Sequence, residues 1–234
     1  MPFHGIITAD IVSSRNIEPD TREKLFEDID LFLKGLKKKW ISRYETFRGD
    51  SLQCEVKRPE LSLRVALIIR CYFRAYIPEE AKPKSSPKKS RKKLPVKGYY
   101  TTAFDIRLAV GIGEVDFIKK NKISNSDGAA FRFSGETLDQ MKSTSQKLAI
   151  VTMDAEFDEQ LTPSILLLDA LIEKWTQNQA ELVLYKLQDI KEEEIATLLH
   201  ISQSAVNQRT RTAQWYAIGK LIGYFEKTVQ KRTL

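Results

Sequence analysis

A chain of 234 residues that is 42% hydrophobic can form a packed core without disulfides, as one large domain or two modest ones. Its only cysteines, Cys54 and Cys71, form no CxxC motif, which argues against a structural zinc site and is typical of a reducing cytosol. The chain begins without a basic leader and a long apolar run, and no window approaches the roughly 18 apolar residues of a membrane span. We therefore expect a cytoplasmic protein with no membrane partner.

The net charge of +7 has a local origin. Residues 82–97 hold eight positively charged residues and no acidic one. The net charge of this segment, +8, is therefore one unit larger than the net charge of the whole chain. Because Pro, Ser and Lys dominate this segment, residues 81–98 are predicted to be a mobile insertion. It is either an insertion without a role or a phosphate contact that adds salt-sensitive, sequence-independent affinity for nucleic acid. The candidate contacts are Lys88, Lys89, Arg91, Lys92 and Lys93.

The pattern of the first 153 residues alternates between strands and helices. Residues 5–12 are apolar and β-branched like a buried strand, and residues 21–39 carry an apolar stripe at helical spacing. Residues 43–57 alternate around Gly49 and Asp50, which predicts a hairpin with Asp50 at its tip. The remaining elements are a helix at 61–76, a strand at 101–113, a helix at 134–141 and a strand at 148–152. This order predicts an α+β fold with helices against one face of a mostly antiparallel sheet.

The composition changes after this region. Residues 154–163 are acidic and end in proline, so we predict a connector between an α/β domain at 1–153 and an all-α domain at 164–234. Helices are predicted at 165–175, 179–187 and 217–229, besides two short ones described below. Trp175, Trp215 and Tyr216 are expected in the core of this second domain.

Residues 194–215 are predicted to form two short helices joined by a tight turn. Ile195 and Leu199 belong to one apolar face, and Val206 resumes the pattern after a break at 200–202. Ser202 is a good N-cap for the second helix. The outer face of that helix offers groups that suit base edges in the major groove of DNA: Gln203, Ser204, Asn207, Gln208 and Arg211. The alternative is an ordinary helical hairpin without a role in DNA binding.

This stretch resembles the helix-turn-helix of phage repressors and of bacterial sigma factor region 4. The matching features are the small Ala196, the apolar Leu199 and Ile201 around the turn, and Val206 in the second helix. His200 stands where such motifs usually have glycine, so it must adopt a left-handed backbone or shift the turn. The glutamates at 192–194 begin the first helix and are expected to point away from DNA.

A pair of carboxylates stands out in the first domain. Asp10 ends the first predicted strand and Asp50 lies at the hairpin tip, so both meet at one edge of the sheet if these strands are neighbours. Such a pair can hold Mg²⁺ beside a nucleoside triphosphate. Three interpretations are open: the residues order local turns, belong to a nucleotide sensor without turnover, or serve a nucleotidyl cyclase or transferase. Arg107 is a candidate phosphate contact, an ordinary surface charge or a partner for a nearby acid.

Three motifs carry a second resemblance. ADIVSSR, RGDSL and RLAVGIGEV, in this order, are similar to class III nucleotide cyclases, whose catalytic domain has a palm-like βαββαβ fold. ADIVSSR, RGDSLQ, SDGAAFRFSG at 126–135 and the C-terminal helix-turn-helix together resemble the SatD family of bacterial proteins, and this resemblance covers nearly the whole chain. The cyclase resemblance implies metal binding by Asp10 and Asp50. It also implies a triphosphate beside the backbone of Ile11, Val12, Ser13 and Ser14.

The chain departs from the cyclase pattern in one segment. Ala130 and Ser134 stand where cyclases carry an Asn and an Arg, and Arg132 is out of step with them. A missing cation removes electrostatic stabilisation worth about 3 kcal/mol, so cyclisation is not expected.

These features favour a DNA-binding transcriptional regulator with a degenerate, cyclase-like sensor domain. Because a single helix-turn-helix buries little DNA, a homodimer on a two-fold site is expected. The alternative is a Mg²⁺-dependent enzyme that binds a purine nucleotide through Asp10 and Asp50.

Overall fold

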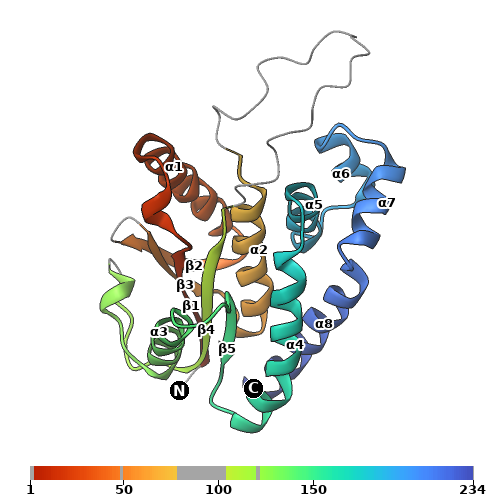
Figure 1. The fold of residues 1–234 in the computed structure, drawn as a ribbon. Coiled ribbons are helices and arrows are strands. Elements are labelled where there is room, and N and C mark those ends of the chain that lie inside the picture. Colours follow the sequence, from red (N-terminus) through yellow and green to blue (C-terminus); the bar gives the residue numbers. More distant parts are fainter. Residues whose placement is uncertain (1–2, 48–49, 78–103, 120–121, 234) are drawn as a thin grey trace.

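The computed structural model describes residues 3–47, 50–77, 104–119 and 122–233 (Figure 1). The predicted basic insertion, with its five candidate DNA contacts, lies outside the described residues, as does Gly49 of the hairpin.

A five-stranded mixed sheet organises the first half of the chain (Figure 1). Its spatial order is β2-β3-β1-β4-β5, and all neighbours are antiparallel except β4 and β5. The strands are β1 (Phe3–Ile11), β2 (Ile41–Phe47), β3 (Ser51–Val56), β4 (Ile106–Glu114) and β5 (Leu148–Val151). The predicted α+β class and the mostly antiparallel sheet are confirmed.

Helices cover both faces of the sheet, so the prediction of one covered face was wrong. Ile7 of β1 belongs to the apolar cluster of α1 (Pro19–Leu36) and α2 (Ser62–Ala75), whereas its neighbour Ile6 packs with α3 (Ala129–Met141). Successive residues of a strand face opposite sides, so the two clusters lie on opposite faces. Gly111 of β4 lets α3 approach closely, because a Cβ there would collide with the carbonyl of Ala130. The continuous apolar runs of β1 and β4 are typical of strands buried on both sides.

The second half is helical in its described part. It contains α4 (Ala155–Glu173), α5 (Gln177–Leu187), α6 (Glu192–Leu198), α7 (Gln203–Thr212) and α8 (Trp215–Thr233). The predicted connector at 154–163 was wrong, because α4 begins at Ala155 and continues through Pro163. The side chain of Asp154 caps this helix by accepting a hydrogen bond of 2.9 Å from the amide of Phe157. Acidic residues that suggested a linker occupy the first turn, where negative charge favours the helix dipole.

A buried ionic cluster joins α4 to the sheet region. The fully buried Arg70 of α2 donates to Asp105, just before β4, at 3.1 Å and to Asp169 of α4 at 2.5 Å. Arg74 donates to Asp105 at 3.0 Å and to the carbonyl of Trp175 at the same distance. Two guanidinium groups thus meet two carboxylates, which is the balance that buried charges require.

Candidate functional site

The turn between α6 and α7 has the backbone that its sequence predicts. His200 has φ 51°, the left-handed conformation, and the amide of Ile201 donates to the carbonyl of Ala196 at 3.0 Å. Ser202 caps α7 by accepting a hydrogen bond from the amide of Ala205 at 3.2 Å. The left-handed backbone of His200 and the N-cap of Ser202 are therefore confirmed.

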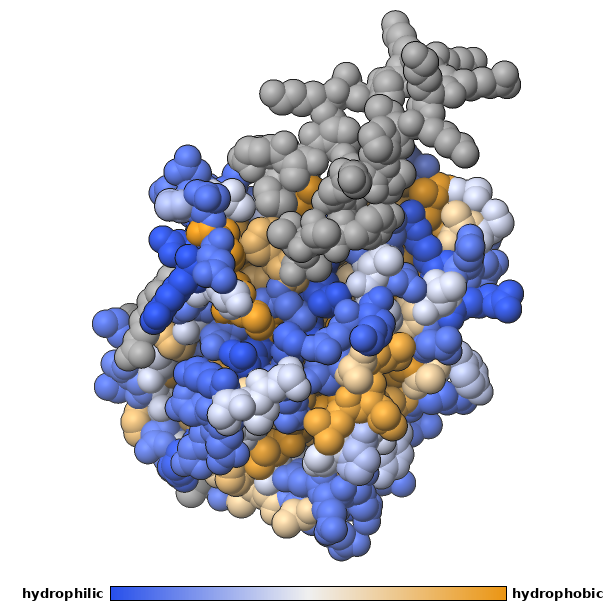
Figure 2. Space-filling model, viewed as in Figure 1, coloured by the Kyte–Doolittle hydropathy of each residue, from blue (hydrophilic) through white to orange (hydrophobic). Residues whose placement is uncertain are grey.

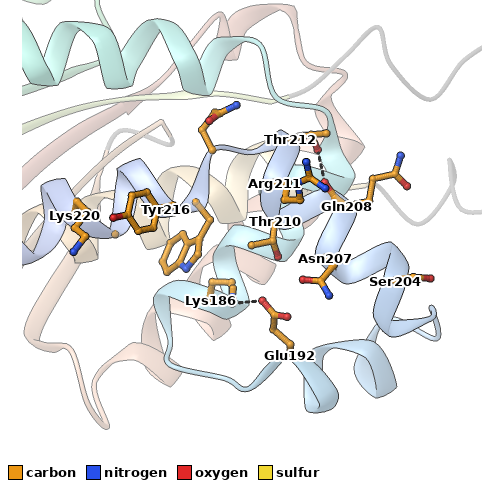
Figure 3. Close-up of a pocket in the computed structure, with 13 residues that line it drawn as sticks. Lys186, Glu192, Ser204, Asn207, Gln208, Thr210, Arg211, Thr212, Tyr216 and Lys220 are labelled. Atoms are coloured by element: carbon orange, nitrogen blue, oxygen red, sulfur yellow. Dashed lines mark hydrogen bonds and ion pairs between the residues drawn. The ribbon is translucent and has the colours of Figure 1, made fainter.

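Packing fixes which side of α7 faces solvent. Val206 is buried, as is Ile195 of α6, so the two helices lean on each other and on α5. The five predicted DNA contacts of α7 are all exposed: Gln203, Ser204, Asn207, Gln208 and Arg211. Figure 3 shows the last four on the side of the helix that lines an open groove.

Two of these five side chains have partners within the chain. The Gln203 amide donates to Glu193 at 3.4 Å, and the hydroxyl of Ser204 lies 2.9 Å from that of Ser202. Within the described ranges, the side chains of Asn207, Gln208 and Arg211 make no hydrogen bond or ion pair, and they lie within a little more than one helical turn.

The groove has a volume of about 1190 Å³ and lies between α7 and the first turns of α8. Tyr216 lines it with 78% of its surface exposed, and the ammonium of Lys220 lies 5.4 Å from the Tyr216 ring centre. The expectation that Tyr216 belongs to the core was wrong, because α8 turns this residue outward while Ile218 points inward. Trp175 is buried as predicted.

The charges around the groove favour an anion. Arg211 and Lys220 line it, and Glu192, the one acidic residue among the described residues of its lining, is paired with Lys186 at 2.6 Å (Figure 3). Glu192 therefore faces the groove, where Lys186 offsets its charge.

Arg209 has a different neighbour. It acts on Glu181 of α5, whose pKa is raised by burial and lowered in part by the Arg209 charge. Of the two arginines of α7, Arg211 is thus the one that lines the groove.

The predicted carboxylate pair lies at one end of the sheet, as the sequence suggests. β1 pairs with β3, and the amide of Ile11 donates to the carbonyl of Asp50 at 2.9 Å. Each carboxylate has a partner within the chain. Arg107 of β4 places its Nη1 3.0 and 3.1 Å from the two oxygens of Asp10, and the Ser14 hydroxyl donates to Asp50 at 2.9 Å. Arg107 is therefore a partner for a nearby acid, which was one of its three predicted roles.

These partners decide how well a metal ion fits. Mg²⁺ needs oxygen ligands in a near-octahedral arrangement, whereas Asp10 already faces a guanidinium through both oxygens. Across the ranges that the structure describes, no group of three or more His, Cys, Asp or Glu residues is placed to hold a metal ion. A cation between Asp10 and Asp50 would therefore have to displace the contact of Arg107 with Asp10.

Some of the backbone amides predicted to face a triphosphate already form hydrogen bonds within the protein. The amides of Ile11 and Val12 donate to the carbonyls of Asp50 and Asp105, at 2.9 and 3.0 Å. Ser14 is buried, and Ser13 is exposed with φ 55°. Of these four residues, only Ser13 presents its side chain to solvent without a partner among the described residues.

The positions where cyclases carry Asn and Arg are core positions here. Ala130 and Ser134 are fully buried, and the Ser134 hydroxyl lies 2.8 Å from that of Thr8. Arg132 is exposed and donates to Asp127 at 2.8 Å, away from that contact. Sequence reasoning missed the contact to Thr8, because it depends on α3 lying across β1.

No protein-family model matches this chain, and no curated protein or solved structure matches it significantly. Within the described ranges, every helix is too short or too polar to cross a membrane.

Proposed function

We propose that this protein binds duplex DNA and regulates transcription, with α6 and α7 acting as a helix-turn-helix and α7 as the helix that enters the major groove. The observation that carries the proposal is the side-chain set of Asn207, Gln208 and Arg211. They are exposed, lack intramolecular partners in the described part of the chain, and share a helix whose other side is anchored by Val206. Amides read adenine edges and a guanidinium reads guanine, so this set can select a sequence.

The start of α8 extends this surface. Tyr216 and Lys220 lie across the groove from Arg211, where a phosphate or a sugar of the DNA backbone can contact them (Figure 3). Such contacts fix the position of a protein on DNA without reading its sequence. The pairing of Glu192 with Lys186 supports the proposal, because an unpaired carboxylate in this groove would repel phosphates.

Selection from a pool of randomised duplexes tests the proposal. The wild-type chain is expected to enrich one sequence, and a variant carrying Asn207→Ala and Arg211→Ala is expected to enrich none while keeping its helical content. Lys142→Ala is the matched control, because Lys142 is an exposed cation directly after α3 that pairs with Asp139. Failure of the wild-type chain to enrich any sequence, with binding no tighter than that of the double variant, would contradict the proposal.

A nucleotide site at Asp10 and Asp50 is a second proposal with a narrower basis. The observation that favours it is the hydrogen bond between the amide of Ile11 and the carbonyl of Asp50, which brings Asp50 next to the end of β1. Metal binding there requires Arg107 to move away from Asp10. Calorimetric titration of ATP and GTP with Mg²⁺ into the wild type and into an Asp10→Asn, Asp50→Asn double variant tests it. Nucleotide binding to the wild type that is lost in the double variant would support the site. Equal heats of titration in the two proteins would contradict it.

A further inference from the structure

The exposed side of α4 carries an apolar stripe that no other element covers in the described part of the chain. Leu166 is 45% exposed and Leu167 is 74% exposed, and Pro163 and Ala170 are exposed one turn to either side. Figure 2 shows the hydrophobic patch on the face where Figure 1 places α4. The opposite side of the helix packs into the core through Ile165, so α4 is apolar on both sides.

Charged residues close the stripe at its two ends. At 100° per residue, Glu159 and Lys174 fall on the same side of the helix as the two leucines, about 22 Å apart along the axis. Both are exposed, and neither forms an ion pair with another described residue. Glu173 lies on the same side at the C-terminal end, but its charge is paired with Lys147. The unpaired charges therefore make the stripe acidic at its N-terminal end and basic at its C-terminal end, with an apolar middle.

The stripe is symmetric about the midpoint between Leu166 and Leu167. Pro163 and Ala170 are equally far from this point on opposite sides, and Glu159 and Lys174 are as well. A second copy of α4, antiparallel and related by a two-fold axis through the midpoint, would place leucine on leucine. The same axis would place each Glu159 opposite Lys174 of the other copy.

We infer that α4 is a homodimer interface in which two copies pack antiparallel through this stripe. A two-fold interface must be complementary to itself, and the order acidic, apolar, basic along one helix meets that condition. Isolated apolar side chains are ordinary on a surface, but two adjacent leucines flanked by proline and alanine form a continuous patch of the kind that marks an interaction site. The inference does not depend on DNA binding.

Sedimentation velocity of the full chain, over a range of concentrations, measures the oligomeric state. Wild type is expected to be dimeric at micromolar concentration. Leu167→Lys is expected to raise the dissociation constant at least tenfold, because it places two ammonium groups in an apolar contact. Leu31→Lys is the matched control, since Leu31 on α1 is 64% exposed and lies outside the stripe. A monomeric wild type, or a dimer that Leu167→Lys leaves unchanged, would overturn the inference.

Charge reversal tests the antiparallel arrangement. Glu159→Lys alone puts like charges together at both ends of the interface, and Lys174→Glu alone does the same with the opposite sign. Each single variant should therefore dimerise more weakly than wild type, by roughly tenfold. A mixture of the two variants restores both ion pairs and should form a heterodimer with nearly wild-type affinity. A mixture that associates no better than its components would overturn the antiparallel register.

Discussion

Arg70 of α2 and Asp169 of α4 form a fully buried ion pair of 2.5 Å, although 98 residues of the chain separate them. The second oxygen of Asp169 accepts a hydrogen bond of 2.7 Å from the amide of Lys147, next to β5. One carboxylate thus connects α4 both to α2 and to the sheet. The pair lies beneath the stripe of α4 that we assign to dimerisation, so the stability of α4 depends on it.

Removal of the Asp169 carboxylate should destabilise the protein strongly. Asp169→Ala leaves Arg70 and Arg74 to share Asp105, and an uncompensated buried charge costs about 3–5 kcal/mol. The measurement is the free energy of unfolding from urea denaturation. Asp139→Ala is the control, because Asp139 is 74% exposed and its ion pair with Lys142 should contribute less than about 1 kcal/mol. An equal loss of unfolding free energy in the two variants would show that the buried cluster stabilises the protein no more than a surface ion pair does.

The effect of substitutions at His200 on stability should depend on how well the new residue tolerates the left-handed backbone of the turn. His200→Gly is expected to be neutral or to stabilise the protein by up to about 1 kcal/mol, because glycine adopts positive φ without strain. His200→Val should destabilise it by about 1–2 kcal/mol, since a β-branched side chain disfavours this conformation. Thermal denaturation of the three proteins checks the order, and a glycine variant less stable than the valine variant would be inconsistent with the turn.

The two cysteines should be inert in the folded protein. Burial raises the pKa of both the Cys54 and Cys71 thiols to about 12, and only the thiolate reacts. A disulfide reagent at pH 8 should therefore label neither thiol in native buffer and both in denaturant. Ser145→Cys, at an exposed position, should react at once under native conditions. Fast labelling of native wild type would mean that the core opens readily around α2 or β3.

The basic segment should contribute affinity without specificity. Replacing Lys88, Lys89, Arg91, Lys92 and Lys93 by glutamine should weaken binding to all duplexes alike. If all five contact phosphates, the slope of log K against log salt should decrease by about 4.5. Fluorescence anisotropy over a salt series measures this slope. An unchanged slope would show that these five residues make no contact with DNA phosphates.

Local patterns predicted most of the fold. Strands, helices and their order follow from apolar periodicity, and the left-handed His200 and the cap at Ser202 follow from local backbone chemistry. The connector at 154–163 was predicted wrongly because acidic residues favour both a linker and the first turn of a helix, and only the cap at Asp154 distinguishes the two.

What the sequence could not predict depends on distant neighbours. The Asp10–Arg107 pair requires β4 beside β1, and the Thr8–Ser134 contact requires α3 across the second face of the sheet. Tyr216 was placed in the core because large aromatic residues are often buried, but it lies two residues before the buried Ile218 and therefore on the opposite side of α8, where it lines the groove.

Selective readout by Arg211 is the most direct test of the central claim. Once a preferred duplex is selected, its dissociation constant and that of a scrambled duplex are measured at one salt concentration for wild type, Arg211→Ala and the Lys142→Ala control. DNA reading by α7 predicts that Arg211→Ala loses about 1–3 kcal/mol on the preferred duplex and much less on the scrambled one. The same loss of binding free energy on both duplexes would contradict base reading by Arg211. No loss on either duplex would show that Arg211 does not contact DNA, which would contradict the proposed role of α7.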